Sequence, residues 1–388
     1  MIDSHETLWP LVATALLMLT LPGVALFYGG MVRKKSVLNT MGLALVAWVV
    51  VSLQWLVWGE ALVIGPVASG VDGRPAGTVS PLLEYHTMAG ALALALVAGG
   101  LVERIRFSFF LVFGLLWSAL VYAPIAHWLW GGGWLADKGS LDFAGGAVIH
   151  ISAGVTALVA AILIGPRKGY GRVEMMPNHL PFAVCGAGLM WVGWCGFSAG
   201  PSLAPMTTVT GAFVAIQVAA AAAALVWTAA EWIQRDRPTV LGTVTGAVAG
   251  LVAIAPAAGY IGPLSAIVIG VGAGGLCYMV VNFVKVILGY DDSLDVFGIH
   301  GVGGTWGMIA TGLFASTAVN PDGSDGLFYG YPYQFFAQTV AVLTVWAFAG
   351  GMTALLVKGL EVVLPSRVDE DAEVMGMDLA QHGEKGYS

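Results

Sequence analysis

The segments Asp142-Phe-Ala-Gly-Gly-Ala-Val-Ile-His150-Ile-Ser-Ala-Gly154 and Asp295-Val-Phe-Gly-Ile-His300-Gly-Val-Gly-Gly304 each place a histidine in a long apolar stretch. In both segments an aspartate comes several residues before the histidine, and glycines lie beside it. Ionisable groups are rare within membrane spans and usually mark a functional site. Two such segments in one chain predict a polar site to which two halves of a transporter or channel both contribute.

The composition is that of an integral membrane protein. Hydrophobic residues make up 58% of the chain and charged residues only 10%, and the mean hydropathy is +0.83. Soluble domains have about 25% charged residues, so this chain has too few charges to cover itself in water. The apolar segments have the length of helices that cross a hydrocarbon core of about 30 Å. An all-α membrane protein is therefore predicted, and no motif indicates an enzyme, a cofactor, a metal cluster or a nucleic-acid partner.

Hydropathy predicts about eleven transmembrane helices. An odd number of spans places the two ends of the chain on opposite sides of the membrane. The predicted spans are residues 8–32, 37–65, 82–102, 107–130, 144–165, 180–200, 207–233, 239–256, 262–288, 298–317 and 334–364.

The positive charges predict the orientation. One set of loops and the tail together carry 14 of the 16 basic residues, and the other set of loops carries only Arg74 and Lys138. Cytoplasmic loops of membrane proteins are enriched in Lys and Arg. We therefore expect an extracellular N-terminus and a cytoplasmic C-terminus in the cell or inner membrane.

The two histidines fall in the fifth and the tenth predicted span. A chain of five plus five spans has halves of opposite topology, which is typical of an inverted repeat with its site near the membrane midplane. The eleventh span then lies outside the repeat. Its length of about 30 apolar residues exceeds a perpendicular crossing, so a strongly tilted helix is expected.

Two interpretations of the histidines are open. Both rings could form hydrogen bonds between packed helices, as polar residues often do in membranes. Alternatively, both line a narrow conduit and hydrogen-bond to each other, because a neutral imidazole offers one donor and one acceptor. Such a pair would pass a small hydrogen-bonding molecule or a proton.

Residues near the expected outer mouth also have two interpretations. Asp142 is either the N-cap of the fifth helix or a fixed negative charge that attracts a cation. The aromatic residues nearby are either interfacial anchors or cation–π contacts. These aromatic residues are Tyr85, Trp128, Trp130, Trp134, Trp191, Trp194 and Phe197.

Several motifs, in order along the chain, resemble the Amt/Mep/Rh ammonium transporter family. The first is Pro22-Gly-Val-Ala-Leu-Phe-Tyr-Gly-Gly-Met-Val-Arg-Lys-Lys35, and the two histidine segments also match. The others are Glu103-Arg-Ile-Arg106, Ala126-His-Trp-Leu-Trp-Gly-Gly-Gly133, Gly193-Trp-Cys-Gly-Phe197, Pro256-Ala-Ala-Gly-Tyr-Ile-Gly262 and the tail Gly376-Met-Asp-Leu-Ala-Gln-His-Gly383. The resemblance covers nearly the whole chain.

The resemblance implies a homotrimer with one pore per subunit, which carries ammonium or ammonia across the membrane. It implies that His150 and His300 form a pore-lining pair and that Phe197 gates the pore. It further implies that Trp130, Asp142, Trp194 and Tyr85 belong to the outer substrate site. Residues 1–365 would form the transmembrane transporter domain and residues 366–388 a cytoplasmic regulatory tail, and a trimeric PII-type signal protein would act on the cytoplasmic face.

The chain departs from the family pattern at the outer mouth. A second aromatic ring of the third span is replaced by Ala89, and Pro201 stands where a serine hydroxyl is often found, with Ser202 one position further on. These departures favour an alternative function, an ammonium sensor with little conduction. A channel for another small neutral molecule, such as carbon dioxide, is a further alternative.

Overall fold

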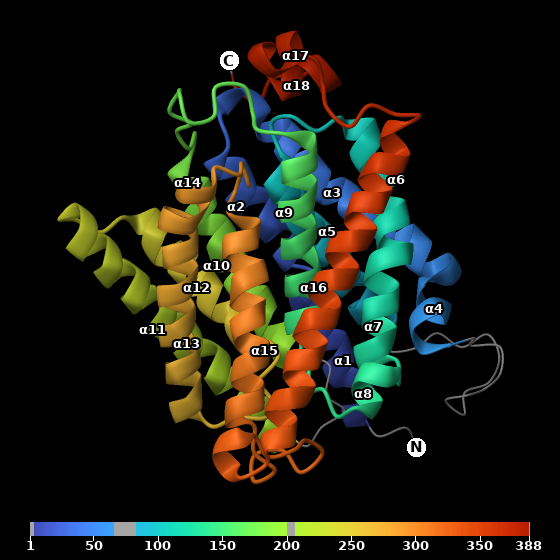
Figure 1. The fold of residues 1–388 in the computed structure, drawn as a ribbon, viewed down its shortest axis with the longest axis vertical. Coiled ribbons are helices and arrows are strands. Elements are labelled where there is room, and N and C mark those ends of the chain that lie inside the picture. The colour runs from blue at the N-terminus through green and yellow to red at the C-terminus, as the bar shows by residue number, and fades with distance from the viewer. Residues whose placement is uncertain (1–3, 66–82, 200–205, 388) are drawn as a thin grey trace.

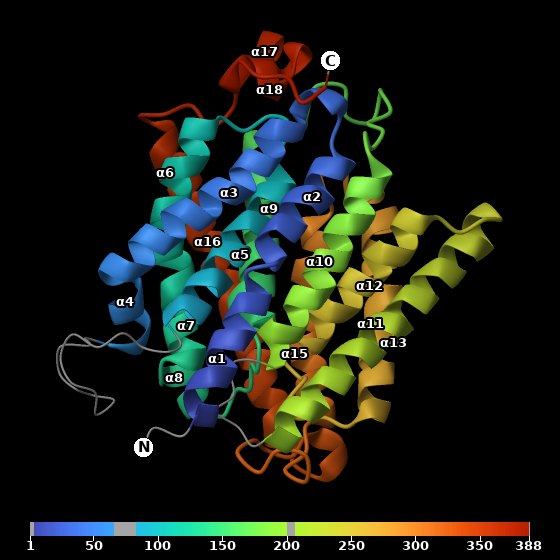
Figure 2. The same ribbon diagram turned by 180° about the vertical axis from the view of Figure 1, so that it is seen from behind.

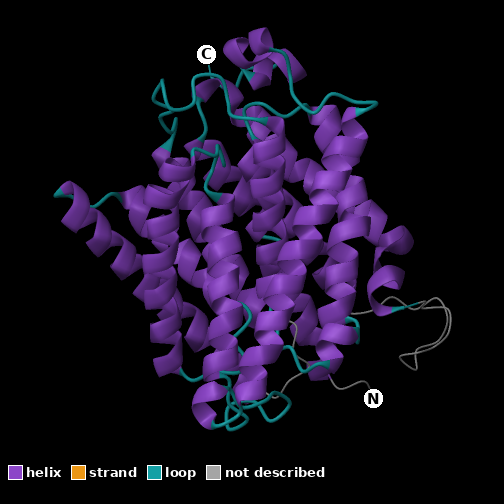
Figure 3. Ribbon diagram, in the orientation of Figure 1, coloured by secondary structure: helices purple, strands orange, loops and turns teal. Residues whose placement is uncertain are grey.

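The computed structural model describes residues 4–65, 83–199 and 206–387, and every named secondary-structure element in these ranges is a helix. Most helices run side by side in one bundle, with the N-terminus at one end and the C-terminus at the other (Figures 1 and 3). The two ends of the chain therefore lie as an odd number of spans requires.

Helices occupy each of the eleven predicted spans. Eight helical stretches are long and apolar enough to cross a membrane by length and composition, within the described residues. The α-helices are α1 (Ser4–Leu17), α2 (Thr20–Met31), α3 (Val37–Gln54), α4 (Glu60–Ile64), α5 (Leu83–Leu101), α6 (Phe107–Trp117), α7 (Ala123–Trp130), α8 (Trp134–Asp137), α9 (Ser152–Ile164), α10 (Leu180–Ala199), α11 (Met206–Arg235), α12 (Val240–Ile254), α13 (Pro263–Met279), α14 (Lys285–Leu288), α15 (Val302–Phe314), α16 (Pro332–Glu361), α17 (Glu370–Met375) and α18 (Met377–His382).

In the described part of the chain, five π-helical turns interrupt or open the long helices. They are η2 (Trp55–Gly59), η4 (Ser118–Tyr122), η5 (Gly146–Ile151), η6 (Val280–Val284) and η7 (Phe297–Gly301). Single π-helical turns inside α-helices are uncommon and often lie at functional sites. Two of these turns, η5 and η7, contain His150 and His300.

The two histidine helices run antiparallel and cross in the centre of the bundle. Arg167, just after α9 ends, is bound to Asp291, just before η7 begins, so one helix ends where the other starts. At the crossing, a Cβ atom on Gly154 would clash with the backbone of Gly301. Glycine is therefore required there, because only a residue without a side chain lets the two backbones approach so closely.

The last long helix, α16, packs along both histidine helices. Its 30 residues correspond to about 45 Å of α-helix, which exceeds the hydrocarbon core of about 30 Å. The helix is inclined to its neighbours (Figures 1 and 2), as its length predicts. Its Gln338 amide bonds to the backbone N–H and C=O of Leu141, and so fixes the loop that precedes η5.

Candidate functional site

The fold brings His150 and His300 into direct contact. Their Nδ1 atoms lie 3.3 Å apart, and their ring centroids are separated by 5.3 Å. His150 is completely buried and His300 is 4% exposed. One Nδ1 must donate and the other accept, so the two rings hold complementary tautomers.

Asp142 is the cap of the π-helical turn that carries His150. Its Oδ1 accepts hydrogen bonds from the N–H groups of Gly145 and Gly146, at 2.9 and 2.6 Å. Its Oδ2 accepts from Ala147 and Val148, at 2.8 and 3.1 Å. Each oxygen thus accepts two backbone donors that a helix start leaves without an intrahelical partner. The carboxylate is 7% exposed, so its direct contacts are structural and only its field reaches outward.

Asp292 has the corresponding position before His300, and its role as a cap was not predicted from the sequence. Its Oδ2 accepts a hydrogen bond from the N–H of Phe297, the first residue of η7, at 2.7 Å. Asp295, which is closer to His300 in sequence, instead forms an ion pair with Lys285 at 2.6 Å. The signal was the pair Asp291-Asp292, but the sequence alone does not distinguish a capping carboxylate from a solvated one.

Two predicted aromatic residues enclose the His150 ring. The Trp194 ring stacks on the His150 ring with centroids 5.3 Å apart and an interplanar angle of 8°. Phe197 presents its edge to His150 at 6.2 Å and is completely buried. Two large rings from the end of α10 therefore cover the His150 ring.

Tyr85 covers the other side of Phe197. The two rings are nearly parallel, with centroids 6.4 Å apart, and the Tyr85 hydroxyl donates a 2.6 Å hydrogen bond to the Phe197 carbonyl. Ala89 lies one turn further along α5 and is completely buried. Pro201 and Ser202, the other departure from the family pattern, lie outside the described residues.

Trp130 is hydrogen-bonded through its indole to the segment that caps η5. Its Nε1 donates a 2.8 Å hydrogen bond to the backbone carbonyl of Asp142. All seven predicted site residues are thus linked in one continuous series of contacts. In order, the series is Tyr85, Phe197, Trp194, His150 and His300 on one branch, with Asp142 and Trp130 joined to it through η5.

A large cavity begins on the other side of His300. It has a volume of about 840 Å³, and His300 and Ile299 are among its lining residues. Charged side chains in its wall include Glu231, Arg235 and Asp295. The histidine pair therefore lies between the ring stack on one side and a cavity with some charged residues in its wall on the other, as expected of the narrow part of a pore.

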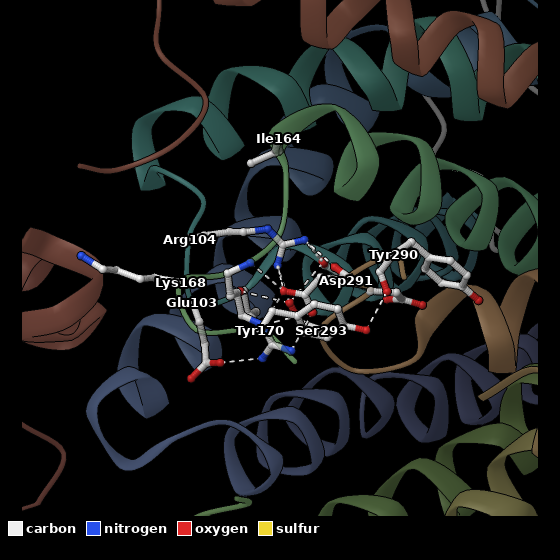
Figure 4. A network of polar contacts seen from close by, with 12 residues as sticks. Glu103, Arg104, Ile164, Lys168, Tyr170, Tyr290, Asp291 and Ser293 are labelled. Carbon is white, nitrogen blue, oxygen red and sulfur yellow. Dashed lines mark hydrogen bonds and ion pairs between the residues drawn. The ribbon is translucent and has the colours of Figure 1, made fainter. Parts of the chain in front are cut away.

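A buried ion-pair network (Figure 4) joins segments that are far apart in the sequence. It lies at the end of the bundle that holds the tail, because Lys168, the residue after Arg167, bonds to Glu373 of α17. Arg167 binds Glu103 at 2.6 Å and Asp291 at 2.8 Å. Arg104 donates to the Ser293 hydroxyl and to the Asp291 carbonyl, both at 2.6 Å. These ion pairs were not predicted from the sequence, because Arg167 is distant in the sequence from both of its acidic partners.

The network shifts the titration of its carboxyl groups. Burial disfavours the charged form of Glu103, but the charges and hydrogen bonds of Arg167 and Arg33 outweigh it and hold the pKa of Glu103 below its ordinary value. Burial likewise opposes the charged form of Asp291, and the hydrogen bonds and charge of Arg167, with the charge of Arg104, lower the pKa of Asp291. Both carboxylates are therefore negatively charged near neutral pH.

The tail helices α17 and α18 pack on the same end of the bundle (Figures 1 and 2). Asp378 Oδ1 accepts a 2.8 Å hydrogen bond from the N–H of Asn39 on α3. Gln381 bonds to the backbone of Phe107 and Ile105 beside α6. Lys35 donates to the carbonyl of Glu373 at 2.7 Å. The tail is thus bound to the ends of α3 and α6 rather than separate from the bundle.

Comparison with known proteins gives matches along nearly the whole chain. Residues 8–387 match the model of the Ammonium Transporter Family. An ammonium transporter of Bacillus subtilis is 42% identical, with 98% of each chain covered. The ammonium transporter Amt1 of Archaeoglobus fulgidus is 40% identical, again with 98% of each chain covered.

Solved structures agree with the fold. The crystal structure of Candida albicans Mep2 is 34% identical and superposes with a TM-score of 0.88, covering 99% of this chain and 90% of that one. A structure described as a sensor Amt protein has a TM-score of 0.90 at 24% identity, with 98% of each chain covered. At that identity, the second likeness supports the fold alone.

Proposed function

This chain belongs to the ammonium transporter family and is a multi-pass membrane transporter of ammonium, and we propose that it moves the substrate along the His150–His300 pair as neutral ammonia. The contact between the two Nδ1 atoms, at 3.3 Å, is the observation that supports this proposal most strongly. Relatives named as ammonium transporters, at 40–42% identity, favour transport over the sensor and carbon dioxide interpretations.

The physical problem is the hydration of a small cation. Moving a bare ion into a medium of low dielectric costs of order 20 kcal/mol in the idealised limit. An aromatic face replaces part of the lost hydration, by about 2 kcal/mol or more once the cation is desolvated. We assign this role to Trp130 and Tyr85 at the outer site, with the field of the Asp142 carboxylate adding to the attraction.

Transfer of one proton from ammonium to the water of the outer solution, above Phe197, then makes the rest of the passage inexpensive. Ammonia is neutral, so it does not incur the cost of burying a charge among apolar side chains. It is also a hydrogen-bond donor and acceptor, and so can bond to the ring nitrogens of the two histidines as it passes them. Potassium has no proton to lose and would enter the pore as a charged ion, at the full cost of burying its charge. This mechanism therefore selects by acid–base chemistry rather than by size.

Phe197 and Trp194 form the closed section of the path in this proposal. Phe197 must move for ammonia to reach His150, and the bond from the Tyr85 hydroxyl to the Phe197 carbonyl holds the backbone while the ring rotates. Past His300, ammonia enters the cavity of about 840 Å³. Ammonia regains water there and takes up a proton.

The test is ammonium flux in proteoliposomes for His150→Ala, His300→Ala and His150→Phe. The alanine variants remove the imidazole, and the phenylalanine variant keeps the ring volume without its nitrogen atoms. We expect each variant to change the flux or its selectivity over potassium. The control is His179→Ala, whose ring lies at the start of α10 and accepts a hydrogen bond from the Phe182 N–H. Parental flux and selectivity in all three pore variants would exclude the histidine-pair mechanism.

Assembly and regulation follow as further proposals from the family resemblance. We propose a homotrimer with an extracellular N-terminus, in which residues 366–388 form a cytoplasmic regulatory segment that responds to a PII-type signal protein. The basic loops at the end of the bundle that holds the tail support the orientation, and the contacts of the tail with α3 and α6 support a regulatory role. Native mass spectrometry, with and without a PII protein, tests the trimer and the complex together.

A further inference from the structure

Beside the outer site, but away from the histidine pair, lies a group of buried polar side chains without protein partners. Gln54 and Trp55 are each 1% exposed, and Tyr122 is completely buried. Both polar atoms of the Gln54 amide, the Trp55 Nε1, the Tyr122 hydroxyl and the His86 Nδ1 have no hydrogen-bond partner among the described residues. Most buried polar groups in proteins are paired with protein or ordered water, so this group requires an explanation.

These side chains belong to one place in the fold. The Trp55 ring centroid lies 5.8 Å from that of Tyr122 and 6.4 Å from that of His86. A Cβ atom on Gly90 would lie 3.1 Å from the Tyr122 ring and 3.2 Å from Val51. Gln54 lies three residues after Val51 on α3, which places it on the same helix face. The rings of Trp55, His86 and Tyr122 therefore meet where η2, α5 and η4 come together, and Gln54 precedes Trp55 at the end of α3.

The backbone at this junction is unusual on two sides. Trp55 is the first residue of the π-helical turn η2, and Tyr122 is the last residue of the π-helical turn η4. Two interruptions of regular helix thus present polar rings to each other. Since π-helical turns are often retained at functional sites, this is an independent reason to expect that the junction binds something.

The chemistry of the group fits water as a ligand. Trp55 offers only a donor, the Gln54 amide offers both donors and an acceptor, and Tyr122 offers both in its hydroxyl. No side chain in the group carries a full charge that would bind an ion. A cation such as ammonium needs acceptors and is opposed by the indole N–H, whereas water donates and accepts.

We propose that Gln54, Trp55, His86 and Tyr122 hold a cluster of ordered water molecules beside the outer site. His86 is half-buried, and its ring lies 6.1 Å from that of Trp130 with an interplanar angle of 27°. The cluster therefore extends from the junction to the side of Trp130. Water held there hydrates the outer site from within the protein, and this site is separate from the histidine pathway.

Radiolytic hydroxyl labelling with mass spectrometry tests the proposal on the intact protein in nanodiscs. Side chains next to bound water are oxidised even when they are buried. Trp117 is the matched reference: its ring lies 6.1 Å from that of Tyr122, but it is completely buried and its Nε1 is bonded to the Thr156 hydroxyl at 2.9 Å, so it has no polar atom left to bind water. We expect Trp55 and Tyr122 to be labelled several-fold faster than Trp117. Labelling at the rate of Trp117 would overturn the proposal.

Two further arms identify the ligand. In Gln54→Leu, which keeps the approximate volume of the side chain but removes its polar atoms, labelling of Trp55 is expected to fall towards the rate of Trp117. Unchanged labelling in the folded variant would contradict the role of Gln54. Saturating ammonium is expected to leave the labelling of Trp55 and Tyr122 unchanged in the parent protein. Protection by ammonium would overturn the water assignment in favour of a second cation site, whether or not the histidine variants alter transport.

Discussion

Replacing Asp142 by asparagine tests the cap that positions His150. The Asp142 carboxylate accepts four backbone N–H groups, at distances of 2.6–3.1 Å. Asparagine keeps one accepting oxygen and replaces the other by an NH₂ group, which accepts no hydrogen bond. Two buried backbone donors then lose their acceptor, at about 1–3 kcal/mol each, so we expect a loss of about 2–6 kcal/mol in the free energy of unfolding.

The assay is thermal unfolding of the purified protein in detergent, together with ammonium flux in proteoliposomes. Flux is expected to fall as well, because His150 lies in the π-helical turn that Asp142 caps. Asp137→Asn is the matched control, since Asp137 is an exposed aspartate five residues earlier. Parental stability and flux in Asp142→Asn would refute the reasoning.

Asp142→Glu separates the cap from the electric field. Glutamate keeps the negative charge but places its carboxylate one carbon further from the backbone donors. If the four hydrogen bonds fix His150, this variant loses stability and flux like Asp142→Asn. If the field alone acts on the cation, Asp142→Glu retains the parental flux while Asp142→Asn loses it.

The remaining predictions concern the buried ion-pair network. Arg167→Met leaves the carboxylates of Glu103 and Asp291 with fewer partners and is expected to lower the free energy of unfolding by about 3–5 kcal/mol. Arg172→Met, on an exposed side chain, is the control. An equal effect of the two variants would contradict a specific role for the network. Because the pKa values of Glu103 and Asp291 are lowered in the folded state, their contribution to stability is complete above their ordinary pKa values and disappears as the pH falls through the folded-state values. Unfolding measured against pH should therefore show a weaker loss on acidification in Arg167→Met than in the parent. Asp292 acts in the opposite direction, because burial raises its pKa from 3.8 to about 6. Its contribution to stability therefore declines as the pH rises through this interval. Asp292→Asn should remove that decline, and a decline equal to that of the parent protein would contradict the prediction.

Sequence patterns predicted the helical membrane fold because the hydropathy of a segment indicates whether it lies in water or in lipid. A run of apolar residues of membrane-spanning length has few alternatives to a helix, since every backbone N–H and C=O must be bonded within the segment. The prediction of a long inclined last helix also follows from length alone and agrees with α16. The π-helical turns were not predicted, because hydropathy does not record a single inserted residue.

The site was predicted in part. The residue types at His150 and His300 were informative because an imidazole is out of place in an apolar span. Because burying an imidazole is costly, both histidines could be predicted as site residues without knowing that their rings are in contact. The role of Tyr85 was less accessible, since an aromatic residue near an interface has several ordinary explanations. Its bond to the Phe197 carbonyl depends on how α5 and α10 are placed relative to each other.

The sequence by itself therefore determined that this protein is a helical membrane transporter with two costly histidines, because hydropathy and burial cost are properties of individual residues and short segments. Only the tertiary structure decided which polar atoms meet. It placed His150 Nδ1 against His300 Nδ1, Arg167 against Asp291, and four amide groups against the Asp142 carboxylate. Hydrogen bonds and ion pairs depend on distances of a few ångströms, and the packing of distant helices alone sets these distances.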